Sequence, residues 1–291
     1  MLGYSRQGLY KAQATHQQQC FEEELIVQQV NKIRMHQPRI GGRRLHHMLQ
    51  AFMQGHQLQM GRDVFFKLLF DSGLLVRKRK RRKPATTDSF HRYKKYKNLV
   101  KEFVHVASNQ LWVSDITYIT LKNCFAYLSL ITDAYSRKIV GFYLSKSLGA
   151  SGSIKALKMA LNNNSNLQSI IHHSDRGVQY CCNDYVRILK NKKIKISMTE
   201  NSDPLENAIA ERVNGILKDE LLQEVYGDFT AAQESIAKAI SVYNHLRPHS
   251  SISYKTPAEV HYSNDKVERK WKNYYVKKEV SKVEVADELY R

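Results

Sequence analysis

The stretch LWVSDITYI (residues 111–119) has the composition of a β-strand, because most of its residues are β-branched, aromatic or aliphatic. Side chains alternate between the two faces of a strand, so Asp115 shares a face with Val113, Thr117 and Ile119. A carboxylate on such a face is not placed there for solubility, since a buried charge without a partner is costly. Asp115 is therefore a candidate for a role in the chemistry of the chain.

The sequence around this strand predicts an α/β domain. Residues 111–121, 125–132 and 138–145 predict a three-stranded meander. Downstream, predicted helices alternate with predicted strands, which is typical of a mixed sheet with helices on both faces. These further elements are a helix at 154–161, a strand at 168–173, a helix at 178–190, a strand at 193–199 and a long helix at 205–225.

Two more acids lie at positions that suggest function. Asp175 comes at the carboxyl end of a predicted strand, just before Arg176 and Gly177, where open α/β sheets bind their ligands. Glu211 lies inside a predicted helix, four residues after Asn207 and three before Asn214, so these three side chains project from one side. The arrangement predicts that both elements present polar groups to one site.

Three carboxylates brought together would repel one another unless a cation lay between them. Magnesium prefers oxygen ligands and often shares carboxylates with substrate phosphates. Two such ions about 4 Å apart can activate an attacking oxygen and stabilise a leaving oxygen at phosphorus. In the alternative interpretation each acid makes a separate local bond, with Asp115 as a buried cap, Asp175 in a turn and Glu211 as an exposed helix charge.

Other polar residues compete for these roles. Asp133 is a rival first carboxylate, but it precedes a turn, so we expect it to cap that turn. His172 and His173 could position a phosphate or a metal, although a structural role is favoured. The rivals of Glu211 are acids at a helix start, where the helix dipole favours negative charge: Glu200, Asp203 and Glu206.

The charge of the chain points to a polyanionic partner. The formal net charge is +19, and the first 100 residues hold 20 basic against 6 acidic residues. Residues 77–83 are seven consecutive basic residues, followed by basic and aromatic residues alternating over 91–97. Such a run cannot pack, but it can displace counterions from nucleic-acid phosphates. A passive linker kept soluble by its charge is the alternative.

The N-terminal part is predicted to be helical. Ile26, Val30 and Ile33 recur at helical spacing, and a second helix, with Leu45, Met48, Leu49 and Phe52 on one stripe, ends at Gly55. A third helix runs from about Gly61 to Asp71, and its inward residues are Val64, Phe65, Leu68 and Leu69. The second and third helices form either a helix-turn-helix that binds DNA or a small bundle.

The C-terminal part is predicted to hold two more helices. Thr230 and Gln233 form a candidate capping box for a helix that ends at Arg247-Pro248-His249, and Thr256-Pro257 starts a short last helix. The four cysteines form no C-x-x-C pair, and no apolar run approaches the roughly 18 residues of a membrane helix. We therefore expect a reduced, soluble, intracellular protein without a membrane partner.

At these residues the sequence resembles a known family, the DDE integrases and insertion-sequence transposases. Thirty-five residues separate Asp175 from Glu211, as in the DDE pattern, and the resemblance is strongest to second-frame (OrfB) transposases of the IS-three group. It covers most of the chain, from Leu2 to about Val260. The matching segments are 110–118, 133–141, 173–180, 197–199, 207–211, Lys218, Glu220, 243–244, 247–249 and 256–259.

The resemblance implies a ribonuclease-H-like core in which Asp115, Asp175 and Glu211 bind two magnesium or manganese ions. It also implies the reaction. Water attacks a phosphodiester at a transposon end, and the freed 3′-hydroxyl attacks another phosphodiester, so strands are joined without a covalent enzyme intermediate. The implied partners are transposon-end DNA, target DNA, further copies of the chain and a smaller upstream-frame product, as a fusion or a partner.

From these observations we expect a cytoplasmic, nucleoid-associated enzyme with five regions. They are a helix-turn-helix-like region (1–75), a basic linker (76–104), the catalytic core (105–225), a helical extension (226–264) and a charged tail (265–291). The alternatives are a catalytically silent DNA-binding regulator and a stand-alone nuclease of the same fold. The candidate DNA contacts are Arg43, Arg44, Arg62, Arg77, Lys78, Arg79, Lys80, Arg81, Arg82, Lys83, Arg176, Asn207 and Lys218.

Overall fold

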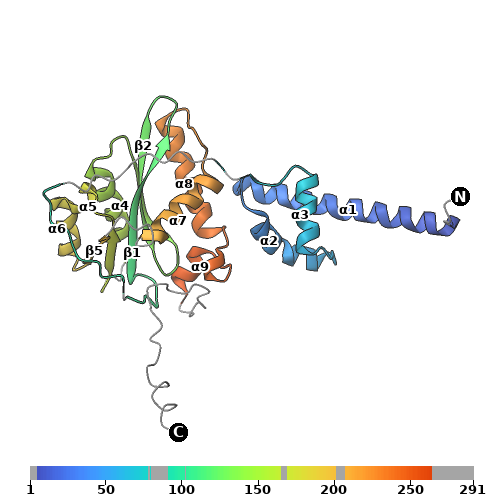
Figure 1. The fold of residues 1–291 in the computed structure, drawn as a ribbon, viewed down its shortest axis with the longest axis horizontal. Coiled ribbons are helices and arrows are strands. Elements are labelled where there is room, and N and C mark those ends of the chain that lie inside the picture. The colour runs from blue at the N-terminus through green and yellow to red at the C-terminus, as the bar shows by residue number, and fades with distance from the viewer. Residues whose placement is uncertain are drawn as a thin grey trace, which may run out of the picture.

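A five-stranded mixed sheet in the order β3-β2-β1-β4-β5 forms the centre of the larger part of the molecule (Figure 1). The computed structural model describes residues 5–77, 79, 91–101, 103–164, 169–200 and 207–263. The first three strands are antiparallel, while β4 and β5 run parallel to β1. The ribonuclease-H-like mixed sheet predicted from the sequence is thus confirmed. The strands are β1 (Leu111–Thr120), β2 (Phe125–Asp133), β3 (Ile139–Ser145), β4 (Ile171–Ser174) and β5 (Lys195–Met198).

Helices cover both faces of this sheet (Figure 1). On one face Trp112 and Ile131 pack with residues of α4, α5 and α6, and Gly141 allows α4 to approach closely, because a Cβ there would collide with the backbone oxygen of Ala156. On the other face Leu128 packs with residues of α7, α8 and a π-helical turn, η2. These elements are α4 (Ala150–Asn162), α5 (Val178–Cys181), α6 (Asn183–Asn191), α7 (Ala208–Ile216), η2 (Leu217–Leu221) and α8 (Phe229–His245).

Three helices precede the sheet and have a hydrophobic core of their own. They are α1 (Arg6–His36), α2 (Gly42–Gly55) and α3 (Arg62–Asp71). Ile26 and Val30 of α1 pack with Leu45 and Leu49 of α2 and with Phe65 of α3. The prediction that Val64 points inward is wrong, because its side chain is 57% exposed while Phe65, Leu68 and Leu69 fill the core.

The N-terminal helices dock on η2 through arginine side chains. Arg39 donates from Nε to the backbone oxygen of Asp219 at 3.0 Å, and its backbone N–H donates to the oxygen of Glu220. Arg44 donates to Glu220 Oε1 at 3.0 Å, and Arg79 contacts Glu224 together with the backbone oxygens of Lys218 and Leu222. The turn η2 therefore connects the N-terminal helices to α7, the helix that carries Glu211.

The chain after η2 differs from the prediction of one helix over 205–225. Tyr226 pairs with Leu121 at the end of β1, so the chain is extended there instead of helical. The predicted helix 178–190 is likewise divided, since Cys182 has extended backbone between α5 and α6. Both breaks follow from tertiary packing, which overrides helix propensity.

The C-terminal helices are capped as their local sequence allows. Asp228, and not Thr230, caps α8, because its side chain accepts from the backbone N–H of Ala231. The helix start predicted at Thr256-Pro257 is confirmed for α9 (Pro257–Tyr262), where Thr256 and Glu259 form a capping box. This helix follows a short 3₁₀ turn, η3 (Ser250–Ile252). The tail expected at 265–291 lies outside the described residues.

Two further findings concern the described residues as a whole. None of their helices combines the length and the apolar composition needed to cross a bilayer. All four cysteines are free, with Cys20 and Cys124 at the surface, Cys181 buried and Cys182 partly buried.

Candidate active site

Asp115 and Asp175 lie at the same level of neighbouring parallel strands. The last aligned pair of β1 and β4 is Val113 with His173, and each acid is two residues further along its strand. Neighbouring strands lie about 4.8 Å apart, so this register brings the two carboxylates together where β4 ends and β1 continues. The prediction that Asp175 stands at the carboxyl end of a strand agrees with this geometry.

Asp115 is held by two hydrogen bonds in an unfavourable electrostatic environment. The backbone N–H of Ile116 donates to Oδ1 at 2.9 Å, and Asn214 Nδ2 donates to Oδ2 at 2.7 Å. Burial, together with the negative charges of Asp175 and Glu211, raises the pKa of Asp115 to about 7, although the two hydrogen bonds act in the opposite direction. The site therefore disfavours negative charge on Asp115 unless a cation is present.

Asp175 is oriented by the turn that follows it. The backbone N–H of Gly177 donates to Asp175 Oδ1 at 3.0 Å. A Cβ on Gly177 would lie 2.8 Å from Gln179 Oε1 and 3.0 Å from Asp175 Oδ1, so a larger residue would displace the carboxylate. The φ of Gly177 is −62°, a value open to any residue. The limited space beside Asp175, and not the backbone conformation, therefore explains why a glycine stands at position 177.

Helix α7 presents Asn207, Glu211 and Asn214 to β1, as their spacing predicts. Asn207, at its N-terminus, donates to the backbone oxygen of Ser114 at 3.1 Å, and Asn214 donates to Asp115. Glu211 lies between them on the same side of the helix, with an exposed side chain. Among the described residues, no three Asp, Glu, His or Cys side chains gather closely enough to hold one metal ion. The three carboxylates are thus not gathered closely enough to hold one ion together.

The two aspartates open onto a small cavity that is accessible to solvent. Both line this cavity, and Tyr118 lines it as well. The remaining lining residues are Ile116, Leu148, Gly177, Gln179 and Tyr180. Gln179 Nε2 donates a hydrogen bond to the backbone oxygen of Leu148. Sequence reasoning did not identify these two residues as part of the site, because neither belongs to a charged motif.

A buried polar cluster supports the two strands beneath the cavity. His172 Nε2 is 2.7 Å from Ser114 Oγ and 2.8 Å from Tyr185 Oη, and His173 Nδ1 is 2.8 Å from Ser197 Oγ. Burial lowers the pKa of His172 to about 3, so its imidazole is neutral at physiological pH. These contacts agree with the structural role that was favoured for both histidines.

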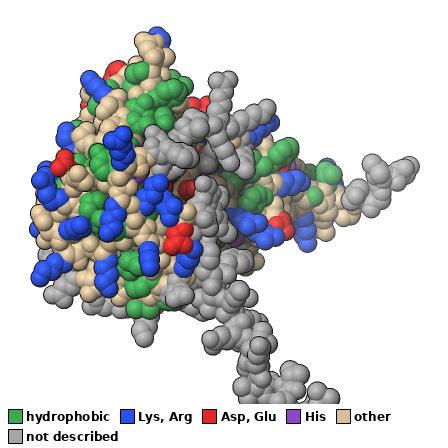
Figure 2. Space-filling model, turned by 60° about the vertical axis from the view of Figure 1, so that its left-hand side comes forward, with side chains coloured by type: hydrophobic (Ala, Val, Ile, Leu, Met, Phe, Trp, Pro, Cys, Tyr) green, Lys and Arg blue, Asp and Glu red, His purple; other side chains and the backbone are tan. Residues whose placement is uncertain are grey.

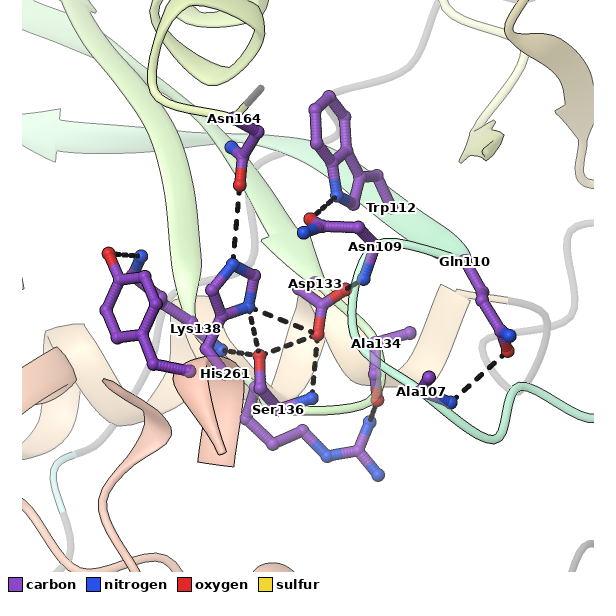
Figure 3. Close-up of polar contacts among 12 residues, drawn as sticks. Ala107, Asn109, Gln110, Trp112, Asp133, Ala134, Ser136, Lys138, Asn164 and His261 are labelled. Carbon is purple, nitrogen blue, oxygen red and sulfur yellow. Dashed lines mark hydrogen bonds and ion pairs between the residues drawn. The ribbon is translucent and has the colours of Figure 1, made fainter. Parts of the chain in front are cut away.

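Asp133 caps a turn, as its position before the turn predicts (Figure 3). Its Oδ1 accepts from both the backbone N–H and the hydroxyl of Ser136, and its Oδ2 accepts from the N–H of Asn109. The pKa of Asp133 is lowered, because hydrogen bonds from His261 and Ser136 outweigh its burial. This residue is fully buried within a separate network that includes α9 and Asn164.

The candidate DNA contacts occupy different environments. Arg43, Arg62 and Arg77 are exposed, and Arg176 is half-buried beside the cavity. Arg44 and Arg79 are partly buried in ion pairs with Glu220 and Glu224, while Asn207 is buried against β1 and Lys218 lies on η2. Figure 2 shows further Lys and Arg side chains on the face that carries α6. Lys78, Lys80, Arg81, Arg82 and Lys83 lie outside the described residues.

The Asp115→Asn variant should be more stable than the wild type when divalent ions are removed. The folded-state pKa of about 7 lies above the unfolded value of about 3.9, so ionisation of Asp115 destabilises the fold. Asn214 can turn its amide and accept from the new Asn, because its Oδ1 is buried without a partner among the described residues. We expect a higher melting temperature, by about 2–4 °C for each kcal/mol that the substitution adds to the free energy of unfolding.

The pH dependence of the stability gained in Asp115→Asn follows from the upward direction of the pKa shift of Asp115. The gain should be full above about pH 7 and should vanish near pH 4, where the acid is protonated in both states. Differential scanning calorimetry in a chelating buffer measures it. Asp184→Asn, which changes an exposed acid paired with Arg187, is the matched control and should give no gain. An equal melting temperature for Asp115→Asn and the wild type at pH 8 would contradict the argument.

Comparisons with known proteins agree with this architecture. Two family models, both described as integrase core domain, match residues 105–204 and 192–257. The chain is 33% identical to an insertion element IS600 uncharacterized 31 kDa protein from Shigella sonnei, over 89% of this chain and 95% of that protein. It is 30% identical to transposase InsF for insertion sequence IS3A from Escherichia coli, over 57% of this chain and 58% of that protein.

Among solved structures, the chain is similar to the catalytic core domain of HTLV-2 integrase, which was solved in complex with magnesium. The identity is 21% and the TM-score is 0.42, and the match covers 53% of this chain and 97% of that chain. The match to the insertion-element protein is long enough and its sequence identity is high enough to assign this chain to a family. This chain belongs to the insertion-sequence transposases of the IS-three group, which are DDE enzymes with an integrase core domain.

Proposed function

We propose that Asp115, Asp175 and Glu211 are the catalytic, metal-binding residues of this transposase. The observation that carries the proposal is the placement of Asp115 beside Asp175 at the mouth of a cavity, where its pKa is raised to about 7. Two neighbouring carboxylates repel each other when both are ionised, and a divalent cation bound between them offsets this repulsion. The same pair offers little advantage to a protein that only binds DNA, since it faces the phosphates with negative charge.

The donor set around the two aspartates fits magnesium or manganese. Carboxylate oxygens and water are the ligands that hard divalent cations prefer. Near the carboxylates, Asn207 and Asn214 each have a buried amide oxygen without a hydrogen-bond partner in the part of the chain that the structure describes. Glu211 has an exposed side chain with several torsions, so we propose that a change of rotamer brings its carboxylate to the other two. We propose two ions per site.

The residues of the chain have separable tasks in this proposal. Asn214 and the N–H of Ile116 orient Asp115, and the N–H of Gly177 orients Asp175. Helix α7 supplies Glu211, and its contacts with β1 hold it over the strand. When bound, the metal ions supply Lewis-acid stabilisation of charge at the phosphorus under attack. The cavity is open to solvent, so both water and a DNA 3′-hydroxyl have access.

The proposed reaction proceeds in two displacements at phosphorus. In the first, the oxygen of water bonds to phosphorus at a transposon end, and the bond to the 3′-oxygen breaks, leaving a 3′-hydroxyl and a 5′-phosphate. In the second, that 3′-hydroxyl bonds to phosphorus in another strand and displaces its 3′-oxygen, which takes up a proton. The partners are transposon-end DNA, target DNA and further copies of the chain. We also propose an upstream-frame product as fusion or partner, and the nucleoid as the place of action.

A strand-transfer assay tests the proposal. The substrate is a labelled duplex that carries the terminal repeat found beside the gene and ends in a 3′-hydroxyl. We expect a joined product with magnesium or manganese, none with a chelator, and recovery when the metal is restored. Cleavage without joining would favour the stand-alone nuclease, and DNA binding without reaction would favour the silent regulator.

A further inference from the structure

The N-terminal half of α1 is a helix without a partner in the described part of the chain. Residues 6–25, here called the arm, project beyond α2 and α3, and all side chains from residue 5 to residue 21 are exposed (Figure 1). Its hydrogen bonds stay within the helix, as from Gly8 N–H to Ser5 Oγ and from Gln18 Nε2 to Glu22 Oε1. Most helical stability in proteins comes from packing of one face of the helix, so an arm of this kind calls for a partner.

The arm has a stripe with two exposed aromatic side chains that points away from its own bundle. Tyr10, Ala14, Gln17 and Phe21 recur at spacings of four, three and four residues, which places them on one side of the helix. Tyr10 is 60% exposed and Phe21 is 59% exposed. Phe21 is five residues from the buried Ile26, and the two therefore point about 140° apart. The side that carries the stripe is thus available to a second molecule.

The charges of the arm are arranged against its own dipole. Arg6 and Lys11 stand at the N-terminal end, the first turn holds no acid, and Glu22, Glu23 and Glu24 follow at the other end. Basic residues at a helix N-terminus oppose the macrodipole, so this order destabilises the arm when it stands alone. The same order is self-complementary when two arms lie side by side in opposite directions.

We propose that the arm is a dimerisation element that pairs in antiparallel orientation with the arm of a second copy. The stripe of one copy packs against the same stripe of the second copy. A two-fold axis that passes between residues 15 and 16 relates the two copies. This axis sets Tyr10 against Phe21 of the partner and Ala14 against Gln17 of the partner. The register thus buries both exposed aromatic side chains at once.

The charged residues support the same register independently. Arg6 and Glu24 are 18 residues apart, which is five full turns, so they lie on one line along the helix. Lys11 and Glu22 are 11 residues apart, close to three turns, and lie on the opposite flank of the stripe. In the antiparallel pair each basic residue therefore meets an acid of the partner. A parallel pair would set Arg6 against Arg6 and the three acids against themselves.

DNA fits this surface less well. The arm holds two basic and three acidic side chains, so it has no positive surplus to attract phosphates. The inference does not depend on the proposed strand-transfer chemistry. It concerns the DNA-free chain, and its test reads association instead of activity.

Sedimentation equilibrium of the full chain, without DNA and under reducing conditions, tests the proposal. We expect a concentration-dependent dimer whose dissociation constant rises at least tenfold in Phe21→Glu, which corresponds to about 1.4 kcal/mol. The matched control is Leu9→Glu, an equally exposed position on another side of the arm, which should leave the constant unchanged. A monomeric wild type, or a dimer insensitive to Phe21→Glu, overturns the proposal.

Charge exchange shows whether complementary ends are required. Arg6→Glu with Lys11→Glu should abolish self-association, and so should Glu22→Lys with Glu24→Lys. A mixture of these two chains should associate, and one chain with all four changes should dimerise again. Because recovery needs only restored complementarity, loss through misfolding is distinguished from loss of pairing. Failure of both the mixture and the fourfold variant to associate overturns the proposal.

Disulfide trapping tests the direction of pairing. In a background with Cys20→Ser and Cys124→Ser, Tyr10→Cys and Phe21→Cys are introduced into separate chains. Residue 10 of one arm lies about 16 Å along the axis from residue 10 of an antiparallel partner, too far for a disulfide. Neither chain alone should cross-link on oxidation, whereas the mixture should. Cross-linking of each chain with itself and not in the mixture means a parallel pair and overturns the proposal.

Discussion

Replacing Asp115 or Asp175 by Asn, or Glu211 by Gln, is expected to lower the rate of 3′-end joining by at least about 10³-fold. A loss of this size corresponds to about 4 kcal/mol of transition-state stabilisation. The reason is that each change removes one negative oxygen from the set that we propose to hold the metal ions, and residues that act as a unit fail together. A double variant should consequently be little worse than any single one. Single-turnover strand transfer with excess enzyme measures the effect.

DNA binding must survive in these variants for the result to bear on catalysis. Electrophoretic mobility shifts with the same labelled duplex should be unchanged or slightly stronger, because a negative charge near the phosphates has been removed. Asp184→Asn and Glu200→Gln are matched controls, since both acids belong to ion pairs outside the cavity. Joining activity within tenfold of the wild type for Glu211→Gln would show that another group supplies the third oxygen.

Glu220→Ala is expected to destabilise the protein by about 3–5 kcal/mol, the cost of leaving a buried charge without its partner. Glu220 accepts from Nε and Nη2 of Arg247 at 2.8 and 2.9 Å, and Arg247 is 1% exposed. Arg44 donates to the same carboxylate. Without Glu220, two guanidinium groups would lie close together with no anion between them. Burial and the charge of Arg247 already lower the pKa of Arg44.

The melting temperature should therefore fall by about 10 °C. Glu224→Ala is the matched control, because Glu224 pairs with Arg79 at an exposed position and should change stability by no more than about 0.5 kcal/mol. Combining Glu220→Leu with Arg247→Met should recover much of the loss, since an apolar pair can replace a buried ion pair. A fall of less than 2 °C in Glu220→Ala would mean that water reaches Arg247 readily.

Local patterns predicted the parts of the fold that depend on local chemistry. Period-two alternation identified β1, and Thr256-Pro257 identified the start of α9. The position of Asp175 followed from the order of strands and helices, which places strand ends at one edge. The side of α7 that faces β1 followed from the spacing of Asn207 and Asn214.

Contacts between distant segments could not be predicted in the same way. Arg44 and Arg79 have the composition of DNA contacts, yet their partners are more than 140 residues away in η2 and the chain after it. Nothing local marks Leu217–Leu221 as a π-helical turn, because its residues suit an α-helix equally well. Val64 has the spacing of a core residue, but the position of α2 decides which side of α3 is covered.

The contact of α9 with Asp133 has a consequence for the synthesis of the protein. Asp133, Ser136 and His261 form one buried network, and His261 belongs to the last described helix (Figure 3). The strand β2 leaves the ribosome more than 120 residues before its histidine partner does. A nascent or prematurely terminated chain that ends before α9 must leave the turn after β2 open to water. Such truncated products should be early targets of cellular proteases, so that translation through α9 becomes a condition for a durable enzyme.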